Sequence, residues 1–397
     1  MRRRQSTKVR KGRLVPRIQL DFSLTKRSDC LAARIEYTRR PQFHYRPQHG
    51  WINDPNGLVW FKGYYHVFYQ HAPNHETPWK EAMHWGHART KDFLNWEELP
   101  VALYPDHDYD VNGCFSGTAI VKGDVLYLFY ASIHRTDRTQ TISVACSQDG
   151  VHFEKFEGNP VIDHYPPQGG PDFRDPAVCC IDGQYYCVVA TGNPVDKTAR
   201  LLLYQSGDLF KWEYASVMSE WPHCKFAECP SFMPAEKGYL LAASVCPLEE
   251  RHYFTVMYGS FANGQFHIDY TGEVDKGPDQ YAGQVFRDHL GRNLLISWIP
   301  GWEYAGYAPK DIGCMSVPRE LKLIHGKVYG YPVQELQHLL KDEDPCLRRT
   351  ETGFIVERSN RAPLIYEGSI TDLKILRDEY IAEIFVNGGE SIYTVLL

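Results

Sequence analysis

Three acidic side chains stand in local sequences that would hold a carboxylate rigidly. Asp54 lies in Asn53-Asp54-Pro55-Asn56-Gly57, Asp175 in Phe173-Arg174-Asp175-Pro176, and Glu228 in Phe226-Ala227-Glu228-Cys229-Pro230. The first segment has the composition of a tight turn, because proline fixes φ while asparagine and glycine tolerate unusual backbone angles. Converging carboxyl groups can transfer protons and attack a glycosidic carbon.

Hydrolysis of a glycosidic bond needs two carboxyl groups on either side of it. A separation of about 5 Å gives retention through a covalent intermediate, whereas about 6.5–9.5 Å leaves room for water and gives inversion. The acid must keep its proton near neutral pH, and Phe226, Cys229 and Phe232 would give Glu228 apolar surroundings. We expect Arg174 to keep Asp175 ionised, as a hydrogen-bond acceptor for sugar hydroxyls. The alternatives are a solvated turn at Asp54 and a structural Arg–Asp turn at Asp175.

Composition narrows the functional class. The 397 residues are 43% hydrophobic and 14% aromatic, which suits β-strands and also suits stacking on sugar rings. The net charge is −6 although residues 1–17 are basic, so the remainder is acidic and nucleic acid is not an expected partner. The 11 cysteines show no metal-ligand spacing, which predicts neither metal nor cofactor. Without an apolar signal segment or an 18-residue apolar run, we expect a cytoplasmic protein with reduced thiols and no membrane span.

Apolar runs recur at intervals of about 55 to 60 residues. Each follows a turn containing Gly or Asp, and the runs cover residues 64–69, 125–130, 185–190, 239–244 and 293–298. A second element, an Asp followed three or four residues later by an aromatic ring, recurs at 92–96, 149–153 and 208–212. This period predicts an all-β fold, a five-bladed β-propeller; a β-sandwich with coincidental spacing is the alternative. Each acid precedes the apolar run of its blade, which predicts that all three meet on one face.

The predicted organisation has four parts. Residues 1–38 form a basic lead-in, 39–331 the propeller, 332–348 a linker with a short helix, and 349–397 a small C-terminal β module. Residues 381–393 are expected to form a hairpin through Asn387-Gly388.

Several motifs together resemble those of glycoside hydrolase family 32, the β-fructofuranosidases. The resemblance covers about residues 40–345 and rests on Trp51 to Gly57, Phe115-Ser116-Gly117, Arg174-Asp175-Pro176 and Glu228-Cys229-Pro230. Trp85-Gly86-His87 through Trp96, Gln280-Tyr281-Ala282 and Val317-Pro318-Arg319-Glu320-Leu321 follow in the family's order.

The resemblance implies a retaining, metal-free hydrolase that removes terminal non-reducing β-D-fructofuranosyl groups. Asp54 would be the nucleophile, Glu228 the acid and base, and Asp175 the group that binds fructose hydroxyls and stabilises the transition state. The fructose subsite would be lined by Asn53, Gln70, Trp79, Phe115, Ser116 and Arg174, with Tyr281 and Trp302 near the leaving group.

The C-terminal end departs from the family pattern. A family member usually carries a β-sandwich of well over 100 residues, and only about 50 remain here. So few strands are not expected to make two stacked sheets with a good core. The remnant is therefore expected to pack on the propeller, or to pair with a second subunit.

Fructosyl transfer is the main alternative, because a fructosyltransferase would use the same carboxylates. A non-catalytic sugar-binding propeller predicts a lost acid, whereas all three acids are present. A related glycosidase acting on arabinan or xylan is disfavoured by the Asn53–Gly57 segment and by Glu228-Cys229-Pro230. The sequence does not choose among sucrose, sucrose 6-phosphate, fructo-oligosaccharides, inulin and levan as substrate.

Overall fold

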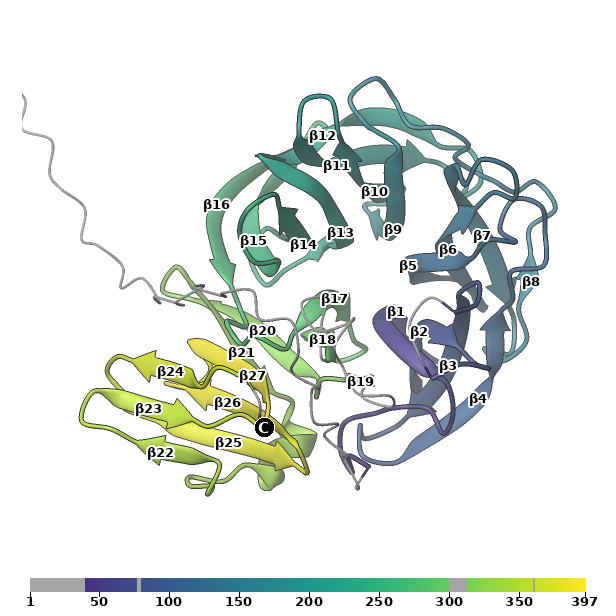
Figure 1. The fold of residues 1–397 in the computed structure, drawn as a ribbon. Helices are drawn as coiled ribbons and strands as arrows, with labels where there is room; N and C mark the ends of the chain where they lie inside the picture. Colours follow the sequence, from purple (N-terminus) through teal and green to yellow (C-terminus); the bar gives the residue numbers. More distant parts are fainter. Residues whose placement is uncertain (1–39, 77–79, 300–312, 360) are drawn as a thin grey trace, which may run out of the picture. The chain divides into compact units, whose positions relative to one another are not determined.

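The computed structural model describes residues 40–76, 80–299, 313–359 and 361–397, all within one compact unit, residues 36–397. Residues 51–332 form antiparallel sheets built on four strands each, arranged around a central axis (Figure 1), and the fifth sheet has one extra short strand. The first sheet holds β1 (Trp51–Phe61), β2 (Tyr64–Ala72), β3 (His84–Thr90) and β4 (Trp96–Leu103). The second holds β5 (Cys114–Lys122), β6 (Val125–Ile133), β7 (Gln140–Ser147) and β8 (Glu154–Lys155).

The next three sheets complete the ring. The third holds β9 (Asp172–Ile181), β10 (Gln184–Asn193), β11 (Thr198–Ser206) and β12 (Glu213–Pro222). The fourth holds β13 (Cys224–Pro234), β14 (Tyr239–Pro247), β15 (Tyr253–Ala262) and β16 (Gln265–Glu273). The fifth holds β17 (Tyr281–Arg287), β18 (Asn293–Ile299), β20 (Arg319–Ile324) and β21 (Lys327–Pro332), with β19 (Cys314–Met315) paired to β18. The prediction of a five-bladed propeller is confirmed for the described residues.

The repeated apolar runs are the second strands of the blades, namely β2, β6, β10, β14 and β18. These strands are buried because each is covered by neighbouring blades on both faces. The first strands β1, β5, β9, β13 and β17 line the centre of the ring and contact one another (Figure 1). A side chain on a first strand can therefore meet side chains from other blades.

The second recurring element is a hydrogen-bonded Asp turn between the third and fourth strands. The Oδ1 atoms of Asp92, Asp149 and Asp208 each accept hydrogen bonds from backbone N–H groups two and three residues later. A hydroxyl two residues before each Asp accepts a further N–H, as Thr90 does from Phe93 at 2.9 Å. These local bonds satisfy the turn backbone and fix where the outer strand begins.

The C-terminal residues form two three-stranded sheets. One sheet holds β22 (Leu347–Arg349), β23 (Gly353–Val356) and β24 (Leu364–Glu367), and the other β25 (Leu373–Asp378), β26 (Ile381–Val386) and β27 (Ser391–Leu396). They share a core that joins Phe354 and Val356 to Ile375, Ile384 and Val395. The expectation that so few strands could not stack was wrong, because short strands with large apolar side chains enclose a core of their own.

The hairpin from β26 to β27 turns at the predicted asparagine and glycine. Asn387 and Gly388 have positive φ values of 53° and 68° and begin a four-residue loop, residues 387–390, between the paired residues Val386 and Ser391. A 3-10 helix, η2 (Gln334–Leu339), precedes this module. The boundaries at residues 38, 331 and 348 stay predictions.

Buried charges join the C-terminal module to the propeller. The ring of His44 contacts Asp378 at 2.9 Å and Glu383 at 3.1 Å, and no part of these three side chains is appreciably exposed. Arg319 on β20 contacts Glu383 at 2.9 Å and Asp275 at 2.7 Å. The β25–β26 hairpin thus ties the segment before blade one to blade five.

Candidate active site

Asp54 lies inside the inner strand β1 rather than in a turn. The pairing of β1 with β2 is interrupted twice, between Ile52 and Pro55 and between Asn56 and Val59. Gly57 has φ +54°, and a Cβ atom there would lie 2.8 Å from the ring of Phe68. The prediction of a tight turn was wrong: the turn-forming residues produce bulges that bend a strand and re-aim its side chains.

Three blades bring the predicted acids together. The Cys229 thiol on β13 lies 3.6 Å from Asp54 Oδ2 and 3.7 Å from Asp175 Oδ2. The backbone N–H of Cys229 donates to Asp175 at 2.9 Å. Asp175 and Cys229 both have positive φ, 58° and 47°, a conformation that costs about 1–3 kcal/mol and is typical of functional sites. The first strands of blades one, three and four thus place their carboxyl groups in one cluster.

Glu228 is held from two sides. Arg174 Nη2 donates to Oε1 at 3.0 Å, and the Tyr281 hydroxyl donates to Oε2 at 2.7 Å. Arg174 also donates to Asp172 at 2.7 Å and lies 4.6 Å from the centre of the Phe226 ring. The expected apolar side chain of Phe226 therefore packs on the guanidinium that contacts Glu228.

The environment shifts the pKa values of two carboxyl groups upward. Burial, followed by the charges of Glu228 and Asp175, raises the pKa of Asp54 to about 7, against the hydrogen bond from Ser116. Burial also raises the pKa of Asp175 to about 6, although Arg174 opposes this shift. Arg174 acts on Asp175 in the expected direction and favours its ionised form, although the hydrogen bonds of the guanidinium go to Glu228 and Asp172.

Two of the predicted subsite residues contact Asp54, and Gln70 and Phe115 lie on the strands β2 and β5 that contact β1. Ser116 Oγ donates to Asp54 Oδ2 at 2.7 Å, and Asn53 Nδ2 donates to Asp54 Oδ1 at 3.0 Å. Gln70 Nε2 donates to the Cys114 carbonyl at 2.9 Å, and the Phe115 carbonyl accepts from Trp85 Nε1 at 2.9 Å. Trp79 and Trp302 lie outside the described residues.

Sequence reasoning missed Gln284. Its Nε2 donates to the Gly117 carbonyl at 3.0 Å, and its Oε1 accepts from the Leu58 N–H at 3.3 Å. Gln284 therefore joins the inner strands of blades one, two and five. The pairing of β17 with β18 shifts register between Tyr281 and Gln284, so strand alternation could not place this side chain.

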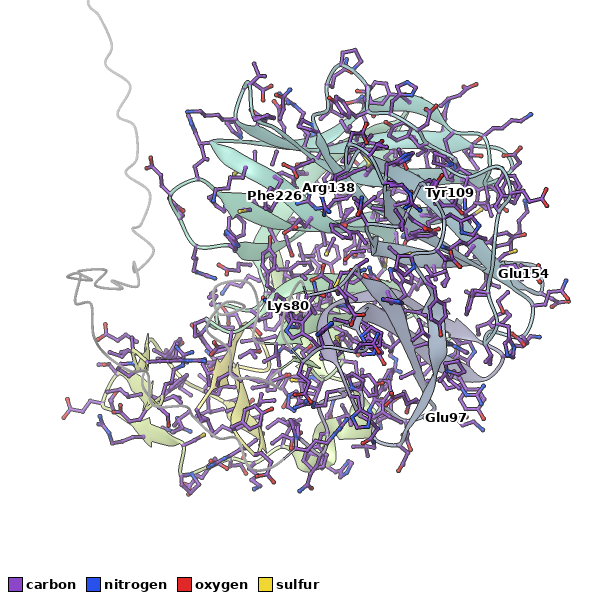
Figure 2. The ribbon with its side chains drawn as sticks, turned by 45° about the vertical axis from the view of Figure 1, so that its right-hand side comes forward. Lys80, Glu97, Tyr109, Arg138, Glu154 and Phe226 are labelled. Carbon is purple, nitrogen blue, oxygen red and sulfur yellow. The ribbon has the colours of Figure 1, made fainter. Side chains whose placement is uncertain are left out.

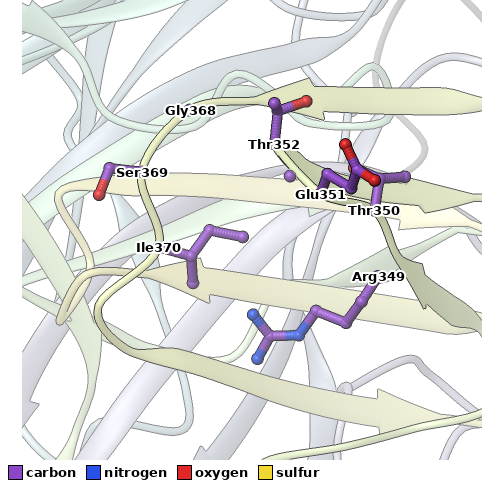
Figure 3. A pocket seen from close by; sticks show the side chains of 8 residues that line it. Arg349, Thr350, Glu351, Thr352, Gly368, Ser369 and Ile370 are labelled. Atoms are coloured by element: carbon purple, nitrogen blue, oxygen red, sulfur yellow. The ribbon is translucent and has the colours of Figure 1, made fainter.

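A second cavity lies apart from the acids. A depression of about 570 Å³ in the C-terminal module is bordered by residues 349–353 and 368–370 (Figure 3). Glu351 supplies the carboxylate among its lining residues. None of the three predicted acids lines it, so it is not the predicted catalytic pocket.

A propeller whose inner strands gather three carboxyl groups is the framework of a glycosidase. The family model described as the glycosyl hydrolases family 32 N-terminal domain matches residues 44–332. The chain belongs to glycoside hydrolase family 32, and the family prediction is confirmed.

Known relatives agree with this assignment. A sucrose-6-phosphate hydrolase of Zymomonas mobilis is 37% identical over 329 residues, covering 76% of this chain and 64% of the relative. A raffinose invertase of Escherichia coli is 33% identical, covering 79% of this chain and 69% of the relative. The chain thus spans about two thirds of the length of the curated relatives it matches.

Solved structures give the same result. The GH32 β-fructofuranosidase BmSUC1 of Bombyx mori superposes with a TM-score of 0.76 at 30% identity, covering 90% of this chain and 89% of the other. A sucrose-6-phosphate hydrolase of Lactobacillus gasseri has a TM-score of 0.78 at 21% identity, with 90% and 88% covered, and supports the fold. Within the described part of the chain, no helix has the length and apolarity needed to cross a membrane.

Proposed function

We propose that this protein is a retaining β-fructofuranosidase that releases terminal non-reducing β-D-fructofuranosyl groups from sucrose, sucrose 6-phosphate or fructo-oligosaccharides. The observation that carries the proposal is the convergence of Asp54 from blade one and Asp175 from blade three on the Cys229 thiol, which follows Glu228 on blade four. The names of the family relatives support the same reaction class: sucrose-6-phosphate hydrolase, raffinose invertase and levanase.

In the proposed first step, Asp54 attacks the anomeric carbon of the fructosyl group. The carbon–oxygen bond to the leaving group breaks as Glu228 gives that oxygen its proton, and a fructosyl ester of Asp54 remains. In the second step Glu228 removes a proton from water, the water oxygen attacks the anomeric carbon, and Asp54 leaves as a carboxylate. No redox partner or cofactor enters these steps.

The charge balance of the site resists complete ionisation. The charge of Glu228 adds to burial in raising the pKa values of both Asp54 and Asp175, and Arg174 is the guanidinium that contacts Glu228. In the proposed reaction the proton that reaches the leaving group comes from Glu228.

Asp175 has the role of binding hydroxyl groups and stabilising positive charge on the fructosyl ring. Its Oδ2 is fixed by the Cys229 N–H at 2.9 Å, and its side chain approaches the pocket from blade three. Asn53, Gln70, Phe115, Ser116 and Arg174, with Trp79, make up the proposed fructose subsite, and Tyr281 and Trp302 the leaving-group side. The buried Asn53 Oδ1 has no hydrogen-bond partner among the described residues and would accept a sugar hydroxyl.

A substrate panel tests the proposal. The wild-type protein, Asp54→Ala and Glu228→Ala are compared on sucrose, sucrose 6-phosphate, 1-kestose, inulin and levan, with Glu97→Gln on the exposed outer strand as a control. We expect fructose release by the wild type and the control, and a loss of 10³-fold or more in both other variants. The enzymatic assignment fails if the wild type releases no fructose from any of these, and the nucleophile assignment fails if Asp54→Ala keeps full activity.

We also propose a cytoplasmic location and keep a homo-oligomer as a prediction. The cysteines of the described residues are all free, which suits a reducing compartment. A homo-oligomer would use the shortened C-terminal module. Light scattering that finds a monodisperse monomer would contradict the oligomer.

A further inference from the structure

Lys155, on the outer strand of blade two, contacts the loop of residues 104–113 that leads into β5. Lys155 lies on β8, and its Nζ donates to the Tyr104 carbonyl at 2.5 Å, Asp106 Oδ1 at 2.6 Å and Asp110 Oδ2 at 2.5 Å. Its side chain is 9% exposed and that of Asp110 0%. Tyr109 precedes Asp110 in the sequence, and Glu154 precedes Lys155. Figure 2 labels Tyr109 and Glu154, which lie on the same side of the ribbon.

The ammonium group of Lys155 occupies a place that resembles a cation site. Ligand atoms of Asp106, His107 and Asp110 lie within 4.8 Å of one another. Because Nζ already contacts both carboxylates, these side chains are satisfied without an added ion. The arrangement of these side chains is explained by their contacts with Lys155, which hold the loop, and needs no bound metal.

Asp110 connects the Lys155 ion pair to the residues just before β5 through hydrogen bonds. Its carboxylate accepts hydrogen bonds from Tyr130 at 2.9 Å and from the His107 N–H at 3.0 Å. Its carbonyl accepts from the Gly113 N–H at 2.8 Å. Gly113 has φ +144°, and a Cβ atom there would lie 2.7 Å from the ring of Phe115, so this end of the loop has little freedom.

The loop ends two residues before a side chain of the catalytic pocket. The Cys114 N–H donates to the Met83 carbonyl at 2.9 Å, and the Cys114 carbonyl accepts from Gln70 at 2.9 Å. Ser116 follows and donates to Asp54 at 2.7 Å. The end of the loop therefore helps to set the backbone position from which the Ser116 hydroxyl reaches Asp54.

We propose that Lys155 is a positioning residue, which acts through Asp110 and residues 104–113 to hold Ser116 against Asp54. This inference rests on the proposed function and adds to it a residue on the outermost strand of blade two. Lys155 has no contact with the three acids in the described structure.

The test follows the pH dependence of kcat/KM, whose acid limb reports ionisation of the nucleophile in the free enzyme. Asp54 is faced by Glu228 from blade four and by Asp175 from blade three, and it accepts hydrogen bonds from Ser116, the Cys229 thiol and Asn53, of which that from Ser116 lowers its pKa most. A loosened Ser116 stabilises the Asp54 carboxylate less, so the acid limb moves to higher pH. We expect Lys155→Met to shift it upward by about half a pH unit and to lower kcat more than it raises KM.

A double variant distinguishes the effect of losing the Lys155 contact from the effect of an unpaired buried charge and from unfolding. Lys155→Met alone leaves the buried Asp110 charge without its partner, which can unfold a protein. Lys155→Met combined with Asp110→Asn removes one charge of each sign, so the net charge is unchanged and the amide still accepts from Tyr130. The acid limb of the double variant should still move upward, because the tether is lost.

Arg292→Met is the matched control. Arg292 is 14% exposed and pairs with Asp288, 0% exposed, and with Glu335, in and beside blade five. Arg292→Met should lower the free energy of unfolding about as much as Lys155→Met does, and it should leave the acid limb of kcat/KM unchanged. The inference is overturned if the double variant has the acid limb of the wild type, or if Arg292→Met shifts it equally. If instead the wild type cleaves no β-fructoside, the proposed function has failed.

Discussion

Ser116 on the inner strand of blade two donates a hydrogen bond of 2.7 Å to Asp54 on the inner strand of blade one. Burial raises the pKa of Asp54 to about 7, and the neighbouring acids add to the shift, whereas this hydrogen bond opposes it. A nucleophile must be ionised before it attacks, so the contact between the two blades sets the pH range of the proposed reaction.

Replacing Ser116 by alanine should therefore move the acid limb of kcat/KM. A hydrogen bond to a charged group contributes about 1.5–3 kcal/mol, so its loss should raise the pKa of Asp54 by about one to two units. The measurement is a pH–rate profile on the best substrate of the panel, with Ser219→Ala on the outer strand β12 as a control. An unchanged acid limb in Ser116→Ala would show that the hydroxyl does not stabilise the nucleophile.

Gln284→Leu should destabilise the centre of the ring. The substitution leaves the Gly117 carbonyl and the Leu58 N–H without partners at buried positions. We expect a loss of about 1–3 kcal/mol in the free energy of unfolding, measured by urea denaturation. The exposed Gln337, which donates to the Pro332 carbonyl, gives the control Gln337→Leu with a much smaller loss. Equal losses in the two variants would contradict the bridging role of Gln284.

The contact of His44 with the C-terminal module should make stability depend on pH. Burial alone would lower the pKa of His44, but the hydrogen bonds to Asp378 and Glu383 overcome it and raise the pKa to about 9. A raised folded-state pKa stabilises the protein fully below the unfolded value of about 6.5, and the gain disappears as the pH rises through 9. The size is of the order of 3 kcal/mol.

The measurement compares thermal unfolding of the wild type and His44→Gln from pH 6 to pH 9.5. The difference in Tm should be large at pH 6 and should shrink toward pH 9.5. His152→Gln, at a histidine 81% exposed beside Asp149, should show no such trend. A constant difference for His44→Gln across this range would show that its charge does not clamp the module.

The sequence was sufficient to predict the blades and the meeting of the acids, because both depend on local repetition. The apolar runs alternate with turns, and Asp54, Asp175 and Glu228 occupy the same strand of their blades. The sequence was not sufficient to predict contacts between residues that lie far apart in the chain. The Ser and Thr hydroxyls of the Asp turns repeat in the chain and could have been found, whereas Gln284 depends on a bulge and Lys155 on a loop three strands away.

The C-terminal module shows a different limit. Counting strands against a minimum size predicted that no stacked core could form, yet Phe354, Ile384 and Tyr393 pack into one. The charges that attach the module lie far apart in the sequence: His44 precedes blade one and Glu383 follows blade five. No local pattern connects residues separated by such a length of chain.

Trapping the intermediate with methanol tests the nucleophilic role of Asp54 most directly. Methanol competes with water for the fructosyl group, and the methyl fructoside that results does not interconvert between anomers, so its configuration can be read by NMR. Two displacements at the anomeric carbon should give methyl β-D-fructofuranoside alone. Formation of the α anomer would mean a single direct displacement and would contradict a covalent role for Asp54.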